Sequence, residues 1–214
     1  LLASGYDREA ADWDQWLLRA VAGSPWDLQI MYGVAGERML PELALDWLPG
    51  YEGSSPVRVG NAAHRQLQLD VYGEIMDCFH LAGERGVEPG GDLQRLQRAI
   101  VDFLASSWTC PDRGIWEMRG RPRQLTYSKV MAWVAVDRAV KAVERFGLDG
   151  PLDEWRRLRA EIHDAVCREG YNPKLGCFVQ SFGSEDLDAS LLMIPLVGFL
   201  PPRDPRVLGT IEAV

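Results

Sequence analysis

The sequence is poor in the features that would tie it to a metal, a disulfide framework or a membrane. Its four cysteines include no C-x-x-C pair, and its three histidines complete no zinc spacing. No apolar run approaches the roughly 20 residues that cross a bilayer. The first residues, Leu1-Leu2-Ala3, resemble a cut inside a longer chain more than a signal peptide. We therefore expect no metal, no membrane contact and a reducing, cytoplasmic setting.

Positive charge is also scarce, with 23 Lys and Arg against 31 Asp and Glu and a formal net charge of −8. The densest basic stretch is only 119–123. Because phosphate binding needs a basic surface, this balance argues against a nucleic-acid partner. Tryptophan, in contrast, is abundant: there are eight, more than the six Tyr or the six Phe. Indole rings stack on sugars and also fill cores, so composition alone leaves both roles open.

Apolar residues recur at three- and four-residue spacing along most of the chain, which predicts a mainly helical protein. We expect helices over 7–21, 61–84, 92–108, 127–146 and 151–170, helix starts near 188 and 205, and strand-like stretches at 28–32 and 177–180. The aromatic segment 24–56 is predicted to be an ordered loop that lines a site.

The predicted helices differ in how much of their surface is apolar. The helix over 127–146 begins apolar on every side, so its first half should be buried all round, whereas its neighbours carry a single stripe. This alternation fits two concentric layers of helices. We also expect Asp92 and Asp188 to cap helices, Trp108 to pack in the core, and Glu74 and Asp77 to lie on a solvated face.

The polar loop 111–120 lies between two long helical patterns and places Glu117 directly after Trp116. A carboxyl group desolvated by an indole can have its pKa raised towards the range that a general acid needs. The alternative is an ordinary loop pair, and the dipeptide alone does not decide between them.

Six stretches, taken in their order along the chain, resemble glycoside hydrolase family 15, the group of glucoamylases, bacterial α-glucosidases and trehalases. They are 27–33, 47–51, 60–62 with 66–73, Gly114-Ile115-Trp116-Glu117, 127–131 and 187–192. The resemblance covers nearly the whole chain and implies an all-α fold that is part of an (α/α)6 toroid of helical hairpins. Residues 1–214 would then form a partial catalytic domain, without its N-terminal segment and its C-terminal half.

The family resemblance implies inverting hydrolysis of α-glucosidic bonds without a cofactor. Glu117 falls on the family's general acid, and the general base is expected in the missing half of the toroid. We therefore expect the isolated piece to be inactive. It should also expose apolar surface of inner helices, which favours association into a homo-oligomer.

The resemblance further implies substrate-binding residues, which are Trp116, Asp70, Gln68, Tyr32, Trp47 and Lys129. The aromatic rings would stack on an α-glucoside or oligosaccharide substrate. Asp70 and Gln68 would bind sugar hydroxyls or, alternatively, hold the start of a helix. Lys129 would place a cation near the site or, alternatively, be solvated.

A second hypothesis comes from a different class: a non-catalytic carbohydrate-binding or scaffold module on the same toroid, since a fold alone does not determine chemistry. That hypothesis predicts a Glu117 that is exposed and far from any cleft.

Overall fold

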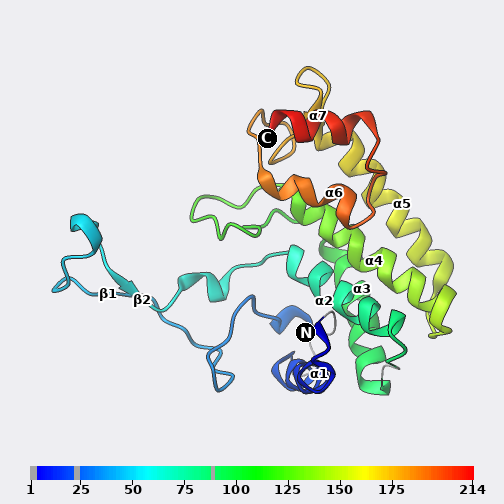
Figure 1. Cartoon of the computed structure of the whole chain (residues 1–214), viewed down its shortest axis with the longest axis horizontal. Helices are drawn as coiled ribbons and strands as arrows, with labels where there is room; N and C mark the ends of the chain where they lie inside the picture. Colours follow the sequence, from blue (N-terminus) through cyan, green and yellow to red (C-terminus); the bar gives the residue numbers. More distant parts are fainter. Residues whose placement is uncertain (1–3, 22–24, 88–89) are drawn as a thin grey trace.

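The computed structural model describes residues 4–21, 25–87 and 90–214. In this part the chain is mainly helical, and the strands are short (Figure 1). The α-helices are α1 (Asp7–Val21), α2 (Asp70–Glu84), α3 (Gly91–Ser107), α4 (Thr126–Phe146), α5 (Leu152–Glu169), α6 (Met193–Leu196) and α7 (Pro205–Ala213). The 3-10 helices are η2 (Pro25–Asp27), η3 (Tyr51–Gly53), η4 (Ala62–Arg65) and η5 (Ala189–Leu192). The strands form two antiparallel pairs, β1 (Leu43–Ala44) with β2 (Arg58–Val59) and β3 (Tyr171–Asn172) with β4 (Cys177–Phe178).

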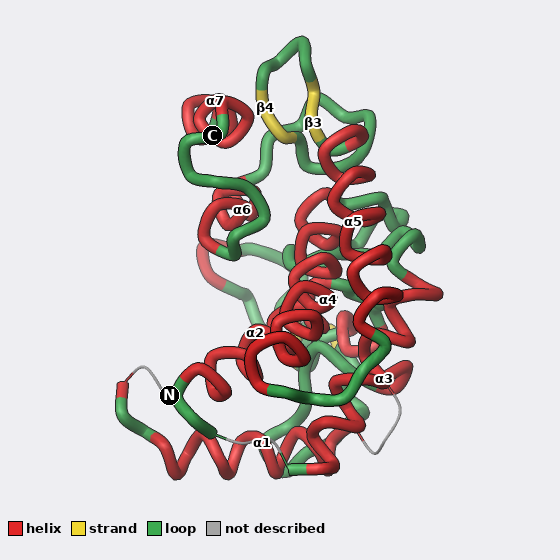
Figure 2. Tube along the Cα trace, turned by 90° about the vertical axis from the view of Figure 1, so that its right-hand side faces the viewer, coloured by secondary structure: helices red, strands yellow, loops and turns green. Residues whose placement is uncertain are grey.

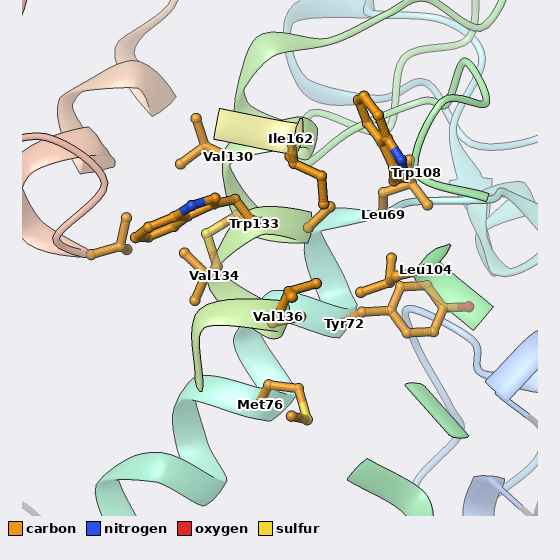
Figure 3. Close-up of a cluster of buried hydrophobic side chains, with 14 of the residues drawn as sticks. Leu69, Tyr72, Met76, Leu104, Trp108, Val130, Trp133, Val134, Val136 and Ile162 are labelled. Atoms are coloured by element: carbon orange, nitrogen blue, oxygen red, sulfur yellow. The ribbon is translucent and has the colours of Figure 1, made fainter. Parts of the chain in front are cut away.

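Helix α4 is the centre of the core, as its apolar sequence predicts. It packs against α2 and α5 and also contacts α3, and its buried residues cover nearly every side of the helix. The buried cluster in Figure 3 joins side chains of these four helices, among them Tyr72, Met76, Leu104, Trp133, Val136 and Ile162. Burial of such side chains is the main term that stabilises a fold of this size. Trp108 lies in this core, which confirms the packing prediction.

The two ends of the helical body carry different elements. Figure 2 shows α7 with β3 and β4 at one end and α1 at the other. The β1–β2 ladder pairs Leu43 with Val59, and it belongs to an arm, residues 42–59, that extends away from the helices (Figure 1). No helix in the described residues has the length and apolar character that a bilayer crossing requires.

The predicted helix over 61–84 is wrong in its first third. Asn61 caps η4 by accepting a hydrogen bond from the Ala63 amide, and Gln66 is then extended (φ −81°, ψ 139°). Helix α2 begins only at Asp70, because the Leu69 N–H is taken by the carboxylate of Asp112, at 3.0 Å. A contact between residues 43 positions apart sets this boundary, and the local pattern does not contain it.

Four smaller predictions also need correction. Residues 28–32 form no strand; instead the backbone N–H of Gln29 donates to the Tyr32 hydroxyl, at 3.1 Å. The third helix begins at Gly91 after the cap residue Gly90, so Asp92 lies in the first turn, where its charge suits the helix dipole. The strand near 177 pairs only over Cys177–Phe178. Of the predicted solvated residues, Glu74 is exposed, whereas Asp77 is half-buried and pairs with Arg138.

Candidate functional site

The loop that carries Glu117 is a closed hairpin between α3 and α4, green in Figure 1. We call it the 112–123 hairpin, because the backbones of Asp112 and Arg123 exchange two hydrogen bonds of 2.9 Å at its neck. Inside it, the Arg113 guanidinium donates to the carbonyl oxygens of Met118, at 3.0 Å, and of Gly120. The hairpin therefore folds around its own arginine.

Glu117 ends a tight turn within this hairpin. Its N–H donates to the Gly114 carbonyl at 3.0 Å, and its own backbone is left-handed, with φ 51°. A non-glycine residue with this φ is uncommon and persists where the surroundings hold it. The side chain is half-buried, and its Oε2 accepts a 2.9 Å hydrogen bond from the Asn61 amide. The carboxyl group is thus held by a neutral donor from another part of the chain.

Trp116 is anchored separately. Its indole Nε1–H donates to both carboxylate oxygens of Asp188, at 2.9 and 3.1 Å, while 58% of the residue stays exposed. Asp188 also accepts from the Ser190 amide at 2.8 Å, which confirms its predicted capping role at η5. The tryptophan is therefore fixed at its polar edge while much of its surface stays open.

Two buried acids lie close together, Asp70 at the start of α2 and Asp112 at the hairpin neck. Asp70 is 5% exposed, and burial, reinforced by the charges of Asp112 and Glu74, raises its pKa to about 7. Its Oδ1 has no hydrogen-bond partner among the described residues. Burial also raises the pKa of Asp112, although the hydrogen bond from the Leu69 amide opposes the shift. Burial therefore disfavours the charged forms of two neighbouring carboxyl groups next to the hairpin neck.

Lys129 belongs to the same buried region, which excludes the second of its two alternatives, a solvated lysine. It is fully buried, and its Nζ donates to the Cys110 carbonyl at 2.5 Å. Burial lowers its pKa to about 8, with the charge of Asp112 acting in the opposite direction. A lysine at the start of a helix is usually solvated, because its side chain is long and charged. Here the packing around α4 encloses the side chain.

The other predicted binding residues lie at different distances from this arrangement. Gln68 is buried and donates to Gln66, which in turn reaches the Glu117 carbonyl at 3.4 Å. Tyr32 is half-buried, with its ring edge-on to Trp16 at 5.1 Å. Trp47 lies in the arm and is 76% exposed. Gln68 is therefore linked to the hairpin through Gln66, and the structure records no bond from Tyr32 or Trp47 to Glu117.

The arm is nevertheless attached to the hairpin by charge. Arg119 donates two hydrogen bonds to the carboxylate of Glu42, at 2.9 and 2.6 Å. The hydrogen bond from Arg119 lowers the pKa of Glu42 to about 2. A cavity of about 500 Å³ beside the hairpin is lined by Arg65, Gln66, Arg113 and Arg119 among others, with Glu117 outside the lining. Within the described residues, no His, Cys, Asp and Glu side chains cluster to hold a metal ion, and no disulfide joins the cysteines.

All of residues 1–214 match the model of the family described as glycosyl hydrolases family 15. The chain belongs to this family. Its helices, with Glu117 in the loop before the buried α4, are accordingly part of an (α/α)6 toroid, as the resemblance implied.

Relatives in the family are named trehalases. One of Mycobacterium tuberculosis is 42% identical over 217 residues, covering all of this chain and 32% of the relative. One of Thermoplasma acidophilum is 35% identical over 214 residues, covering all of the chain and 36% of the relative. The family 15 chain therefore spans about a third of the length of these relatives.

A solved structure shares the fold at lower identity. A glycosidase variant in complex with glucose has a TM-score of 0.63 and 22% identity, over 78% of this chain and 46% of the other. At this identity the likeness shows the fold alone.

The sequence does not reveal the partners of two residues around Glu117, Asn61 beside its carboxyl group and Asp112 at the hairpin neck. These partners, Glu117 and Leu69, are 56 and 43 residues away. Asn61 had one usable signal, because asparagine is a favoured cap at the start of a helical turn. No pattern in the sequence indicates that its amide also reaches a carboxylate of another loop.

Proposed function

We propose that the complete protein hydrolyses an α-glucosidic bond with inversion, that α,α-trehalose is its substrate, and that Glu117 is the general acid. The observation that carries this proposal is the half-buried Glu117 carboxyl group, held by the Asn61 amide in the hairpin that precedes the buried α4. The trehalase names of relatives that are 35–42% identical support the choice of substrate.

The proposed reaction needs two carboxyl groups on opposite sides of the scissile bond. Glu117 gives its proton to the glycosidic oxygen as the bond from the anomeric carbon to that oxygen breaks. A second carboxylate, contributed by a segment outside these 214 residues, takes a proton from the water that attacks the opposite face. One water is consumed and two glucose molecules result from trehalose, the first released in the β configuration.

The exposed indole of Trp116, next to Glu117, is suited to stack on the glucose ring, and we propose Trp47 as a second, outer stacking residue. We also propose that Tyr32 contacts the substrate. The burial of Asp70, Gln68 and Lys129 supports a role behind the hairpin, where Gln68 donates to Gln66 and Lys129 donates to the Cys110 carbonyl. Self-association and a cytoplasmic location stay predictions.

The test is glucose release by the complete enzyme from a panel of α-glucosides, comparing wild type with Glu117→Gln. General acid catalysis is worth about 10² to 10⁴ in rate, so the loss should be of that size. Glu52→Gln is a matched control, because Glu52 is also a glutamate with positive φ (50°) but lies in the arm. Near-normal turnover in Glu117→Gln would refute the role of Glu117 as the acid, whereas a wild-type protein that binds sugar but releases no glucose would favour the binding-module hypothesis instead.

A further inference from the structure

Asp188 makes more contacts than a helix cap requires. Its Oδ1 accepts hydrogen bonds from the Ser190 amide at 2.8 Å, the Ser190 hydroxyl at 2.7 Å and the Trp116 indole at 2.9 Å. Its Oδ2 accepts from Gln180 at 3.2 Å and again from the indole at 3.1 Å. The residue is 8% exposed. Every one of these partners is a donor, which only a carboxylate can satisfy on both oxygens.

The indole is the partner that matters for the proposed reaction, because it precedes Glu117 in the turn. Trp116 is more than half exposed, so packing alone leaves its ring free to rotate. The bond to a buried carboxylate supplies the missing restraint, and hydrogen bonds to charged groups are about twice as strong as neutral ones. It joins residues 72 positions apart and ties the turn to η5, on the other side of α4 in the sequence.

The restraint on Trp116 matters because the next residue, Glu117, has an uncommon backbone conformation. Its left-handed conformation, with φ 51°, is held by the turn bond to Gly114 and by the neighbours of the turn. A reacting group that is displaced by about 1 Å can lose roughly 10²-fold in rate. An anchor one residue before the acid therefore bears directly on where its proton is delivered.

We propose that Asp188 is a positioning residue of the active site, which fixes the Trp116 indole and through it the turn that presents Glu117. This inference rests on the proposed role of Glu117. Asp188 does not touch the sugar; its effect reaches the reaction through the tryptophan.

Substitution by asparagine separates this role from capping. Asn and Asp are equally good caps, so Asp188→Asn keeps the bond to the Ser190 amide. Its NH2 group, however, then replaces Oδ2 and faces the donors of Gln180 and Trp116, so the indole keeps only a bond to a neutral amide oxygen at the Oδ1 position. A residue that only capped η5 would tolerate this change, whereas a residue that orients the indole would not. Trp116→Phe removes the same bond from the other side and leaves the cap of Asp188 intact.

The experiment is a double-mutant cycle in the complete enzyme, with trehalose as substrate. We expect Asp188→Asn and Trp116→Phe each to lower kcat by about 10- to 100-fold, the factor that corresponds to one hydrogen bond to a charged group. The double variant should lie within about twofold of Trp116→Phe, because the two changes remove one interaction. KM should change less than kcat. Asp204→Asn is the control, since Asp204 caps α7 through Arg206, and it should leave kcat unchanged.

An equal effect of Asp188→Asn in both backgrounds, or wild-type kcat in this variant, would overturn the proposal. If Asp188→Asn does not fold, Asp188→Ser takes its place in the cycle, because serine is an equally good cap; coupling to Trp116→Phe then supports the anchor, and additive effects contradict it. The Glu117→Gln measurement tests the acid separately. If Glu117→Gln loses turnover but Asp188 and Trp116 are not coupled, only the anchoring role of Asp188 is refuted. If Glu117→Gln keeps its turnover but Asp188 and Trp116 are coupled, only the acid role of Glu117 is refuted.

Discussion

The amide of Asn61 donates a 2.9 Å hydrogen bond to the carboxyl group of Glu117, across 56 residues of sequence. Asn61 is itself fixed, because its Oδ1 accepts from the Ala63 amide at 2.9 Å and caps η4. The side-chain oxygen and the side-chain nitrogen thus serve two different segments. This relationship places the proposed acid with a donor that carries no charge.

Asn61→Asp should separate these two functions. Aspartate keeps the cap, but it replaces the donated hydrogen with a negatively charged oxygen beside Glu117. We expect kcat/KM for trehalose to fall by about 10- to 100-fold, since a hydrogen bond to a charged group is worth about 1.5–3 kcal/mol. Steady-state kinetics measure the loss, and thermal unfolding checks that stability is retained. A variant with wild-type kinetics would show that Asn61 does not hold the acid.

Gly114 should tolerate no side chain. Its φ is +62°, and a Cβ would lie 2.4 Å from Leu125 Cδ1. Gly114→Ala should therefore lower the free energy of unfolding by about 1–3 kcal/mol and displace the turn that ends at Glu117.

Gly120 is the matched control for that change, since it lies in the same hairpin with open space where a Cβ would be. Denaturant titration of both alanine variants measures the difference. Equal stability and equal turnover in the two variants would show that the turn conformation is unimportant.

The buried Asp70 predicts a pH-dependent stability. Its pKa is about 7 in the folded protein against an ordinary value of 3.8, so between these values the folded state keeps a proton that the unfolded state loses. Stability from this group is therefore present below about pH 4 and is lost progressively as the pH rises to about 7. The groups that face it include Asp112, Glu74 and Tyr127, of which the two acids act in the same direction.

Asp70→Asn removes this titration. We expect Tm to fall more in wild type than in Asp70→Asn between about pH 5 and about pH 8, corresponding to a difference on the order of a few kcal/mol. Scanning calorimetry at both pH values measures it. Parallel Tm curves for the two proteins would show that Asp70 is already ionised when folded.

Much of the helical fold could be predicted because the relevant signals are local. The apolar run that begins at Val130 predicts burial on all sides in the first half of its helix, and every residue of α4 from Thr126 to Val140 is buried. Gly147, with φ +69°, ends that helix as a glycine does at a left-handed cap. These features depend on residues a few positions apart, which a single sequence displays.

The predictions from sequence fail where contacts between residues distant in the chain determine the structure. The start of α2 is set by Asp112, and Lys129 is buried because α4 is enclosed by helices far from it in sequence. The anchoring of Trp116 by Asp188 has the same character. Family resemblance located Glu117, whereas the residues that hold it were visible only in three dimensions.

The most direct test of the general acid uses a substrate that does not need one. α-Glucosyl fluoride has a leaving group that departs without protonation, whereas the glycosidic oxygen of trehalose requires a proton. The complete enzyme and its Glu117→Gln variant should be compared on both substrates by kcat/KM. If Glu117 is the acid, the variant loses about 10² to 10⁴ on trehalose and far less on the fluoride. Equal losses on both substrates, or no loss on trehalose, would contradict the assignment.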